Sequence, residues 1–479
     1  MTMSSTIQPK PDKDRMLDKG GKSIVALMFA LLVAIFAFQL NASMLSPALA
    51  TMAKQLNTTD TQVNLSQTVF FTAAALFSLF LPRLADLAGR KKTLIGMLLA
   101  TAAGCIVSAL APNITVLMIG RILQGASGPM VPLCLIILHV RVTEDAKYAK
   151  LMAILTSVNG GIAGLDALLG GWLAGSFGFR SVFWVMAGIA IVGMVAVSFF
   201  TDESTADETP KMDWLGVLCL GIAFLAAYLV TNEVQKLADA NWIMVAILAV
   251  VAIVFFVLFW QVEKHKKNPL VSTHYMKQRR TWGLLLTTLV AMTGVFAIMN
   301  GIVPQLAQDS ENGVGLSAST VSFCTLTPYA LLGLVFGPVA GMLASKFGYR
   351  KVLRCGLLLT AVGVLFGIYL AFKPSVWAAL VLSMILGITY AGTVNIMLNG
   401  LGIVLSPKDN PGYLPGMNAS MFNLGAGLSF AILSVVMNAF TASAGPAMGY
   451  ASAMIGCAVL TALALALSFL IPNPETLED

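Results

Sequence analysis

Charged residues are scarce in this chain of 479 residues. Asp, Glu, Lys and Arg together make up 11% of it, whereas a soluble globular protein has about 25%. Apolar residues account for 58%, and runs of roughly 20 of them recur along the chain, long enough to cross a bilayer as helices. The alternation of polar and apolar residues that is typical of a membrane barrel is missing. The sequence therefore predicts an all-α polytopic membrane protein and excludes a large soluble enzyme.

Histidine and cysteine are also sparse, and neither residue type shows the spacing of a metal or redox site. The three histidines stand at the edges of apolar runs, and the six cysteines are scattered without a close pair. Gly21-Lys22-Ser23 mimics the end of a phosphate loop, but Met16 stands where its first glycine belongs. No Ser-His-Asp set or catalytic carboxylate pair is evident. We therefore expect no metal, no cofactor and no enzyme activity, and we interpret the cysteines as small buried hydrophobes.

A short basic segment occurs twice. Pro82–Lys92 returns in altered form as Gly341–Lys351, and each copy lies between two long apolar runs. Gly89 and Gly348 match at an offset of 259 residues, as do the leucines five positions before them. A hinge repeated in this way predicts two homologous membrane halves, which is typical of a secondary transporter that works by alternating access.

Both copies resemble the loop between spans two and three of the major facilitator superfamily, whose pattern is roughly G-x-L-a-D-r-x-G-r-r-x. Four residues of the first copy fit it: Asp86, Gly89, Arg90 and Lys91. Pro82 replaces the first glycine, and Ser345 replaces the acid in the second copy. In that family the cluster latches the cytoplasmic gate. The resemblance therefore implies a gating role for these four residues, and a purely topogenic basic loop is the alternative.

Fourteen apolar runs predict fourteen spans. They lie near 24–49, 63–82, 93–111, 114–139, 149–174, 181–201, 214–231, 242–263, 282–305, 319–345, 351–371, 375–401, 415–441 and 448–471. We divide the chain accordingly into a cytoplasmic tail (1–23), an N-terminal half of six helices (24–201), an inserted part (202–281), a C-terminal half of six helices (282–471) and a second cytoplasmic tail (472–479). The inserted part consists of an acidic loop, two spans and a basic linker.

The inserted pair of spans opens with Asp213-Trp-Leu-Gly216 and leaves through Pro269-Leu270. This layout resembles the fourteen-span drug:proton antiporter branch of the superfamily, and the resemblance covers nearly the whole chain. The basic linker at 264–280 predicts either an amphipathic segment on the membrane surface or a solvated connection.

The distribution of basic residues predicts the orientation. Of the 29 Lys and Arg, 24 fall in segments that are cytoplasmic if both termini are, and four fall outside. The net charge of +7 is therefore expected to orient the protein and to contact anionic lipid, not to bind nucleic acid. We expect a monomer in the cell membrane with both termini in the cytoplasm.

Two ionisable residues, Arg121 and Asp166, stand out within the spans, where a charge is costly and marks a functional site by default. Arg121 begins a phrase that resembles the fourth-span pattern R-x-x-q-G, which in relatives is tied to proton coupling; an arginine that pins neighbouring helices is the alternative. Asp166 and Ala167 replace the Gly-Pro of the fifth-span antiporter motif. Asn41 stands in the first span where relatives of this branch carry an acid.

Counted from the span ends, Asn41, Arg121 and Asp166 fall at one level in the outer half of the bilayer. We therefore expect Asp166 to bind the coupling proton and Arg121 to modulate it. A static pair of the two residues and direct contact with substrate are the alternatives. Uncharged polar residues are expected to line a substrate cavity with Asn41: Asn300, Tyr329, Tyr390, Asn395, Asn399 and Asn423.

These observations predict a proton-coupled secondary transporter that exports amphiphilic or cationic small molecules. Because the fifth-span motif is degraded and the first-span acid is missing, the alternative is a proton symporter or facilitator that imports a small organic solute. A third interpretation is a lipid-handling or sensory membrane protein that has lost transport. The expected partners are the small-molecule substrate, protons and membrane lipids.

Overall fold

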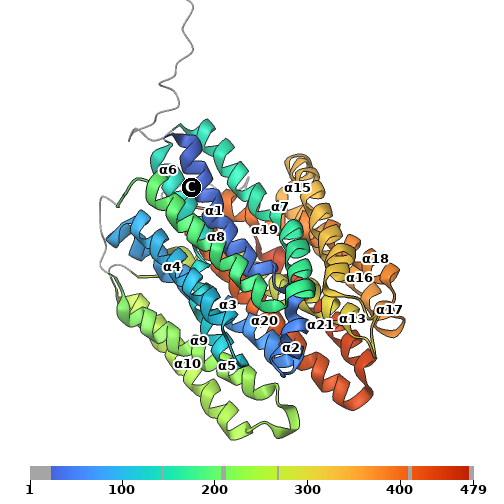
Figure 1. Cartoon of the computed structure of the whole chain (residues 1–479). Helices are drawn as coiled ribbons and strands as arrows, with labels where there is room; N and C mark the ends of the chain where they lie inside the picture. Colours follow the sequence, from blue (N-terminus) through green and yellow to red (C-terminus); the bar gives the residue numbers. More distant parts are fainter. Residues whose placement is uncertain (1–22, 143, 206–211, 267–268, 408–412, 474–479) are drawn as a thin grey trace, which may run out of the picture.

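The computed structural model is a bundle of membrane-length helices (Figure 1). It describes residues 23–142, 144–205, 212–266, 269–407 and 413–473, without the side chains of residue 273 and of several residues between 145 and 164. Thirteen helices in the described part are long and apolar enough to cross a membrane. The 33-residue α7, Asp145–Phe177, lies outside that count and coincides with the remaining predicted span. The all-α fold predicted from the sequence is confirmed.

The first thirteen labelled elements belong to the N-terminal half and the inserted pair. Their bounds are α1 (Ile24–Ser43), η2 (Ser46–Ala48), α2 (Leu49–Gln55), α3 (Asp60–Ala88), α4 (Arg90–Ala109), α5 (Ile114–Gln124), η3 (Gly125–Ser127), α6 (Met130–Arg141), α7 (Asp145–Phe177) and α8 (Phe179–Phe200), then α9 (Trp214–Val234) and α10 (Trp242–His265) of the inserted pair with η4 (Leu237–Asp239) between them. Side-chain caps define several starts, as at Ser23, Thr59 and Asn113, where each side chain accepts from a backbone N–H of the first turn.

The C-terminal half follows a four-residue helix in the linker. Its elements are α11 (Thr273–Met276), α12 (Arg279–Ala297), η5 (Ile298–Ile302), α13 (Val303–Gln308), α14 (Ala318–Val321), η6 (Ser322–Leu326), α15 (Thr327–Phe347), α16 (Tyr349–Val364), α17 (Phe366–Phe372), α18 (Val376–Leu386), η7 (Gly387–Val394), α19 (Asn395–Val404), α20 (Tyr413–Ala444), α21 (Pro446–Leu467) and η8 (Ser468–Leu470). Three of these, η5, η6 and η7, are π-helical, a wider winding that is common at functional sites.

The repeated segment adopts the same turn in both halves. Gly89 between α3 and α4 has φ 111° and ψ 131°, and Gly348 between α15 and α16 has φ 87° and ψ 143°. These positive φ angles are strained for residues with a Cβ, which explains why both copies keep glycine there. We call the end of the bundle that carries these two turns the basic end.

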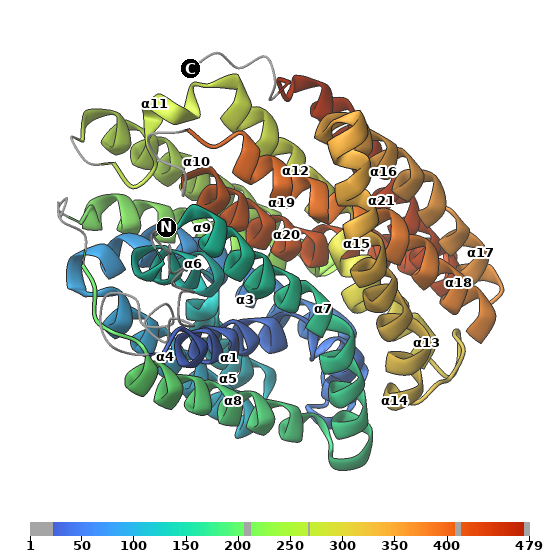
Figure 2. The same cartoon turned by 90° about the horizontal axis from the view of Figure 1, so that it is seen from above.

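The two halves lie side by side and meet along two seams (Figure 2). In one seam α3 packs along α20, and in the other α7 packs against α14 and α15. The cores of both halves are formed by the apolar faces of these helices, and the largest cluster of buried side chains continues across the seams.

The inserted helices α9 and α10 form a pair along one edge of the bundle, where α9 contacts α3 and α20 (Figure 1). Only 6% of the most apolar stretch of α10 is buried, so this helix faces lipid. The basic linker is neither a free connection nor a long surface helix. Its described part packs on the bundle, since Arg83 Nη1 donates to Pro269 O at 2.6 Å and Tyr413 Oη donates to Ser272 O at 3.2 Å.

The cysteine prediction holds in part. Cys105, Cys134, Cys219 and Cys457 are buried, but Cys324 is half-buried and Cys355 is exposed. An apolar run does not show how its helix is rotated about its own axis. It therefore cannot distinguish lipid-facing cysteines from cysteines in the core.

Candidate functional site

Arg121 is fully buried in the N-terminal half. It lies in the last turn of α5. This helix can approach α4 closely because Gly104 has no side chain; a Cβ there would lie only 2.5 Å from Gly120 O. Its guanidinium is held by amides and a carbonyl. Nη2 donates to Gln67 Oε1 at 2.6 Å and to Asn41 O at 3.3 Å, and Nη1 donates to Gln124 Oε1 at 2.5 Å. The ring of Phe70 lies 4.2 Å from the guanidinium carbon, a cation–π contact.

Asp166 is 3% exposed and points into the protein, not into lipid. Its Oδ2 accepts a hydrogen bond from Ser43 Oγ at the end of α1, and its Oδ1 has no hydrogen-bond partner among the described residues. The close approach of α7 to α1 depends on Gly170, where a Cβ would collide with the carbonyl of Met44. A buried carboxyl with one free oxygen is a group that can take up and release a proton once water reaches it.

Arg121 and Asp166 are not an ion pair. Within the described ranges no hydrogen bond or salt bridge joins them, so the static pair is wrong and direct modulation through contact is not supported. The two residues instead bind neighbouring groups of α1, Arg121 through Asn41 O and Asp166 through Ser43. The predicted common level of Asn41, Arg121 and Asp166 agrees with these contacts.

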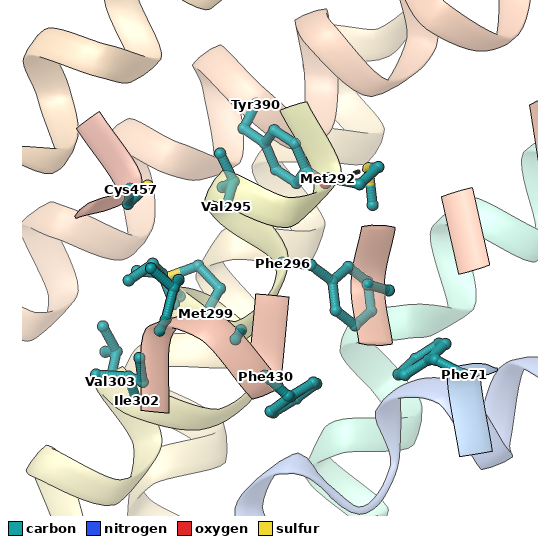
Figure 3. Close-up of a cluster of buried hydrophobic side chains, with 14 of the residues drawn as sticks. Phe71, Met292, Val295, Phe296, Met299, Ile302, Val303, Tyr390, Phe430 and Cys457 are labelled. Atoms are coloured by element: carbon teal, nitrogen blue, oxygen red, sulfur yellow. Dashed lines mark hydrogen bonds between the residues drawn. The ribbon is translucent and has the colours of Figure 1, made fainter. Parts of the chain in front are cut away.

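An aromatic cluster closes the α3–α20 seam at the centre of the bundle (Figure 3). Phe71 of α3 lies 5.0 Å from Phe296 of α12, edge to face, and stacks on Phe430 of α20 at 6.4 Å between ring centroids. Phe296 also contacts Phe422 edge to face at 6.0 Å. Rings from both halves therefore meet here, and π faces of this kind can stack on a planar ligand when the seam opens.

The predicted substrate residues do not form one cavity wall. Asn300 of η5 accepts from Ser46 Oγ across the seam at 3.3 Å, and Tyr390 of η7 donates to Met292 Sδ at 2.8 Å (Figure 3). Asn423 donates to Ser78 Oγ at 3.5 Å and keeps a buried Oδ1 without a partner among the residues described. Tyr329 is half-buried on α15.

The remaining two asparagines lie apart from these groups. Asn399 is exposed on α19, and its Nδ2 donates to Asn395 Oδ1 at 3.0 Å and to Asn395 O at 2.9 Å. The pair thus satisfies itself on one helical face, as the four-residue spacing predicts, and within the described part of the chain no hydrogen bond joins it to the other buried polar groups.

The predicted gating residues form a turn within the N-terminal half. Asp86 Oδ1, near the end of α3, pairs with Arg90 Nη2, at the start of α4, at 2.8 Å, so this ion pair spans the turn at Gly89. The start of α4 is capped by Glu203, whose carboxylate accepts from Lys91 N at 3.0 Å and from Lys92 N at 3.2 Å. A Cβ at Gly89 would lie 2.7 Å from this carboxylate.

Sequence reasoning missed several partners of the site, namely Ser43, Asn64, Gln67, Gln124 and Gln305. Gln124 stands three residues after Arg121 inside the quoted fourth-span phrase, so helical spacing could have found it. Asn64 and Gln67 are amides near the start of the predicted span 63–82, and a polar residue within a span is a signal for a buried polar contact. The choice of partner on another helix has no sequence signal.

Residues 31–230 and 284–479 match the model of the Major Facilitator Superfamily. The chain belongs to the Major Facilitator Superfamily. It is thus a multi-pass membrane protein and a secondary transporter of the major facilitator type, and not an enzyme.

A relative from Lactococcus lactis subsp. cremoris (strain MG1363), a uridine/deoxyuridine transporter, is 61% identical over 458 residues, which is 95% of each chain. More distant is a multidrug resistance protein B homolog from Mycobacterium tuberculosis (strain CDC 1551 / Oshkosh), 27% identical over 58% of this chain and 51% of its own. The drug-transporter resemblance noted from the sequence is therefore present but remote.

Two solved major facilitator structures share the fold. The human organic anion transporter MFSD10 (TETRAN) superposes with a TM-score of 0.60 at 13% identity, covering 96% of this chain and all of that one. The nucleoside transporter NupG superposes with a TM-score of 0.59 at 14% identity, covering 93% of this chain and all of that one. At these identities the likeness extends to the fold alone.

Proposed function

We propose that this protein imports pyrimidine nucleosides, with uridine and deoxyuridine as its first substrates, by proton symport. The observation that carries the proposal is the 61% identity to a uridine/deoxyuridine transporter along 95% of both chains. Import of a small organic solute was the alternative interpretation of the sequence, and this relative favours it over drug export.

The chemistry of the buried polar groups supports a neutral, hydrogen-bonding solute. Eight amides are buried in the bundle: Asn41, Asn64, Gln67, Gln124, Asn300, Gln305, Asn418 and Asn423. An amide offers both donors and an acceptor, which suits the uracil edge and the ribose hydroxyls. The aromatic rings of Phe71, Phe296 and Phe430 offer stacking surfaces for the base.

Asp166 is the proposed proton carrier. Its burial, its free Oδ1 and the absence of an ion pair to it among the described residues suit a group that is neutral when enclosed and ionises when water enters. Arg121, held by amides, is proposed to fix α1, α3 and α5 together beside it. The Asp86 to Lys91 turn is proposed to gate the basic end, which faces the cytoplasm in this account.

Transport into proteoliposomes tests the function. With an inward proton gradient, labelled uridine should accumulate, and external pH should rise as protons enter with it. Asp166→Asn should abolish gradient-driven uptake yet spare exchange of internal for external uridine. Counterflow of protons with an exported cationic dye, in the absence of uridine uptake, would favour the second candidate, multidrug export, which the remote multidrug relatives support. Neither transport nor exchange of any tested solute would overturn both.

A further inference from the structure

Ser43 Oγ has three polar neighbours but carries one proton. It lies 3.0 Å from the carbonyl oxygen of Gln39, 3.0 Å from Gln39 Nε2, and in contact with Asp166 Oδ2. A serine hydroxyl can donate once and accept twice. The amide nitrogen of Gln39 can only donate and the carbonyl can only accept. The state of Asp166 therefore decides whether all three contacts can form together.

With Asp166 protonated, the three contacts are compatible. The carboxyl O–H donates to Ser43 Oγ, Gln39 Nε2 donates to the second lone pair, and the serine proton goes to Gln39 O. With Asp166 ionised, the serine hydroxyl must donate to Oδ2. It then no longer donates to Gln39 O. All three contacts of Ser43 Oγ can therefore be hydrogen bonds at once only when the carboxyl is neutral; when it is ionised, Gln39 O keeps only its backbone hydrogen bond within α1.

The rest of the surroundings favours the same state. Oδ1 has no hydrogen-bond partner in the described part of the chain. Among the elements that pack on α7, α1, η2 and α14 contain no titratable side chain. The titratable side chains on η6, α15, α8 and α6 form no hydrogen bond or ion pair with Asp166 within the described residues; they are Cys324, Tyr329, Lys346, Arg180, Cys134, His139 and Arg141.

We propose that Ser43 is a positioning residue for the coupling proton. Its hydroxyl donates to the Asp166 carboxylate when the proton has left, and rotates to the carbonyl of Gln39 when the proton returns. The proton moves between Asp166 Oδ2 and water, and the ionised carboxylate then needs a second donor at Oδ1. Release therefore requires water to reach the α1–α7 contact, which couples deprotonation to opening of the bundle.

A graded series at position 43 tests this role. Ser43→Thr keeps the hydroxyl, Ser43→Cys weakens the donor and Ser43→Ala removes it. Hydrogen bonds to a carboxylate favour its charged form, so the half-maximal pH of proton-driven uridine uptake should move upward by about one unit or more in Ser43→Ala, less in Ser43→Cys, and little in Ser43→Thr. If Ser43→Ala does not fold, the cysteine variant carries the comparison.

This inference rests on the proposed function only for the transport readout, so a second measurement is made without substrate. Infrared difference titration of the purified protein should show a carboxylic-acid C=O band that is missing in Asp166→Asn and titrates at higher pH in Ser43→Ala. If uridine is not transported but this shift occurs, the Ser43 inference stands and the function fails. Unchanged titration in Ser43→Ala, or equal shifts in the alanine and threonine variants, would overturn the inference.

Discussion

Asn64 and Gln305 exchange two hydrogen bonds across the seam between the halves. Gln305 Nε2 donates to Asn64 Oδ1 at 3.0 Å, and Asn64 Nδ2 donates to Gln305 Oε1 at 3.3 Å and to Ser434 Oγ at 3.1 Å. Both amides are buried. Ser46 and Asn300, and Thr61 and Asn438, bond across the same seam toward the end opposite the basic turns. These contacts latch that end closed in this conformation.

Breaking one side of the amide pair should loosen this latch. Asn64→Ala leaves the buried amide of Gln305 without its partner, a loss of about 1–3 kcal/mol. We expect a lower Tm and faster hydrogen exchange at the ends of α3 and α13. Replacing both residues by leucine leaves no unpaired amide. The double variant should therefore lose less stability than the sum of the losses in the two single leucine variants.

Ser443→Ala provides the control for this cycle. Ser443 is exposed near the end of α20, and its hydroxyl bonds only carbonyls of its own helix, so its Tm should stay close to that of the parent. Strict additivity in the leucine cycle would show that the two amides do not stabilise the closed seam together.

Gly171 determines how closely α7 can pack against α14 in the seam between the two halves. A Cβ there would lie 2.6 Å from Ala318 O and would collide with Ser322 Oγ, and Ser319 Oγ donates to the carbonyl of Gly171 at 3.2 Å. Gly171→Leu should therefore hold α7 away from α14. Overpacking of about 1–3 kcal/mol predicts roughly a tenfold or greater loss of uptake, with normal membrane insertion.

The matched variant is Gly188→Leu on α8. A Cβ at Gly188 meets no heavy atom within 4 Å, so this change adds the same side chain without touching a seam. Its uptake and its yield in membranes should equal those of the parent. Equal losses in both variants would mean that leucine acts through insertion and not through closure.

The spans and the duplicated turns could be predicted from the sequence because they depend on local chemistry. Apolar length fixes a membrane helix, and Gly89 and Gly348 are required by their positive φ. The partners of the buried charges could not be predicted. Arg121 meets Gln67 and Asp166 meets Ser43 only because α5, α3, α7 and α1 take particular rotations in the bundle.

The substrate set illustrates the same limit. Polarity within an apolar run identifies Asn300, Asn399 and Asn423 equally, yet one bonds across a seam, one is exposed, and one keeps a free buried oxygen. Hydropathy does not show which face of a membrane helix points toward the protein core. A helix that is apolar over most of its length, such as α1, has no polar face from which this orientation could be deduced.

Asn423 should be the most sensitive of these asparagines to substitution. Its Nδ2 donates to Ser78 Oγ, which fixes the amide so that its buried Oδ1 remains an acceptor; the preceding residue, Phe422, contacts Phe296 of the aromatic cluster. A nucleobase N–H could bind there once the seam opens. Asn423→Ala should raise the KM for uridine about tenfold, equivalent to one hydrogen bond, at similar membrane abundance.

Asn399→Ala is the comparison for that experiment. Asn399 is exposed and bonds only Asn395 among the described residues, so its KM for uridine should not change. An unchanged KM in Asn423→Ala, or an equal rise in both variants, would remove Asn423 from the substrate path.

Asp213 anchors the inserted helices in a pH-dependent way. Its Oδ1 accepts from Gly216 N at 3.0 Å at the start of α9 and pairs with Lys266 Nζ at 3.2 Å after α10. Burial raises the pKa of Asp213, but the Gly216 N–H and the Lys266 ammonium outweigh it, so the pKa lies below the ordinary value of 3.8. The carboxylate therefore contributes stability that is complete above about pH 4 and is lost as the pH falls through the folded pKa.

Asp213→Asn keeps a good helix cap and removes only the charge. The difference in Tm between parent and variant should shrink as the pH falls from about 4 toward about 3, where the Asp213 carboxylate is protonated. Lys266→Met should show the same trend with a smaller amplitude, because Lys266 is half exposed and its pair is partly screened. A difference that persists unchanged at the lowest pH would mean that the carboxylate charge does not anchor α9, and that the backbone cap alone holds the inserted pair in register.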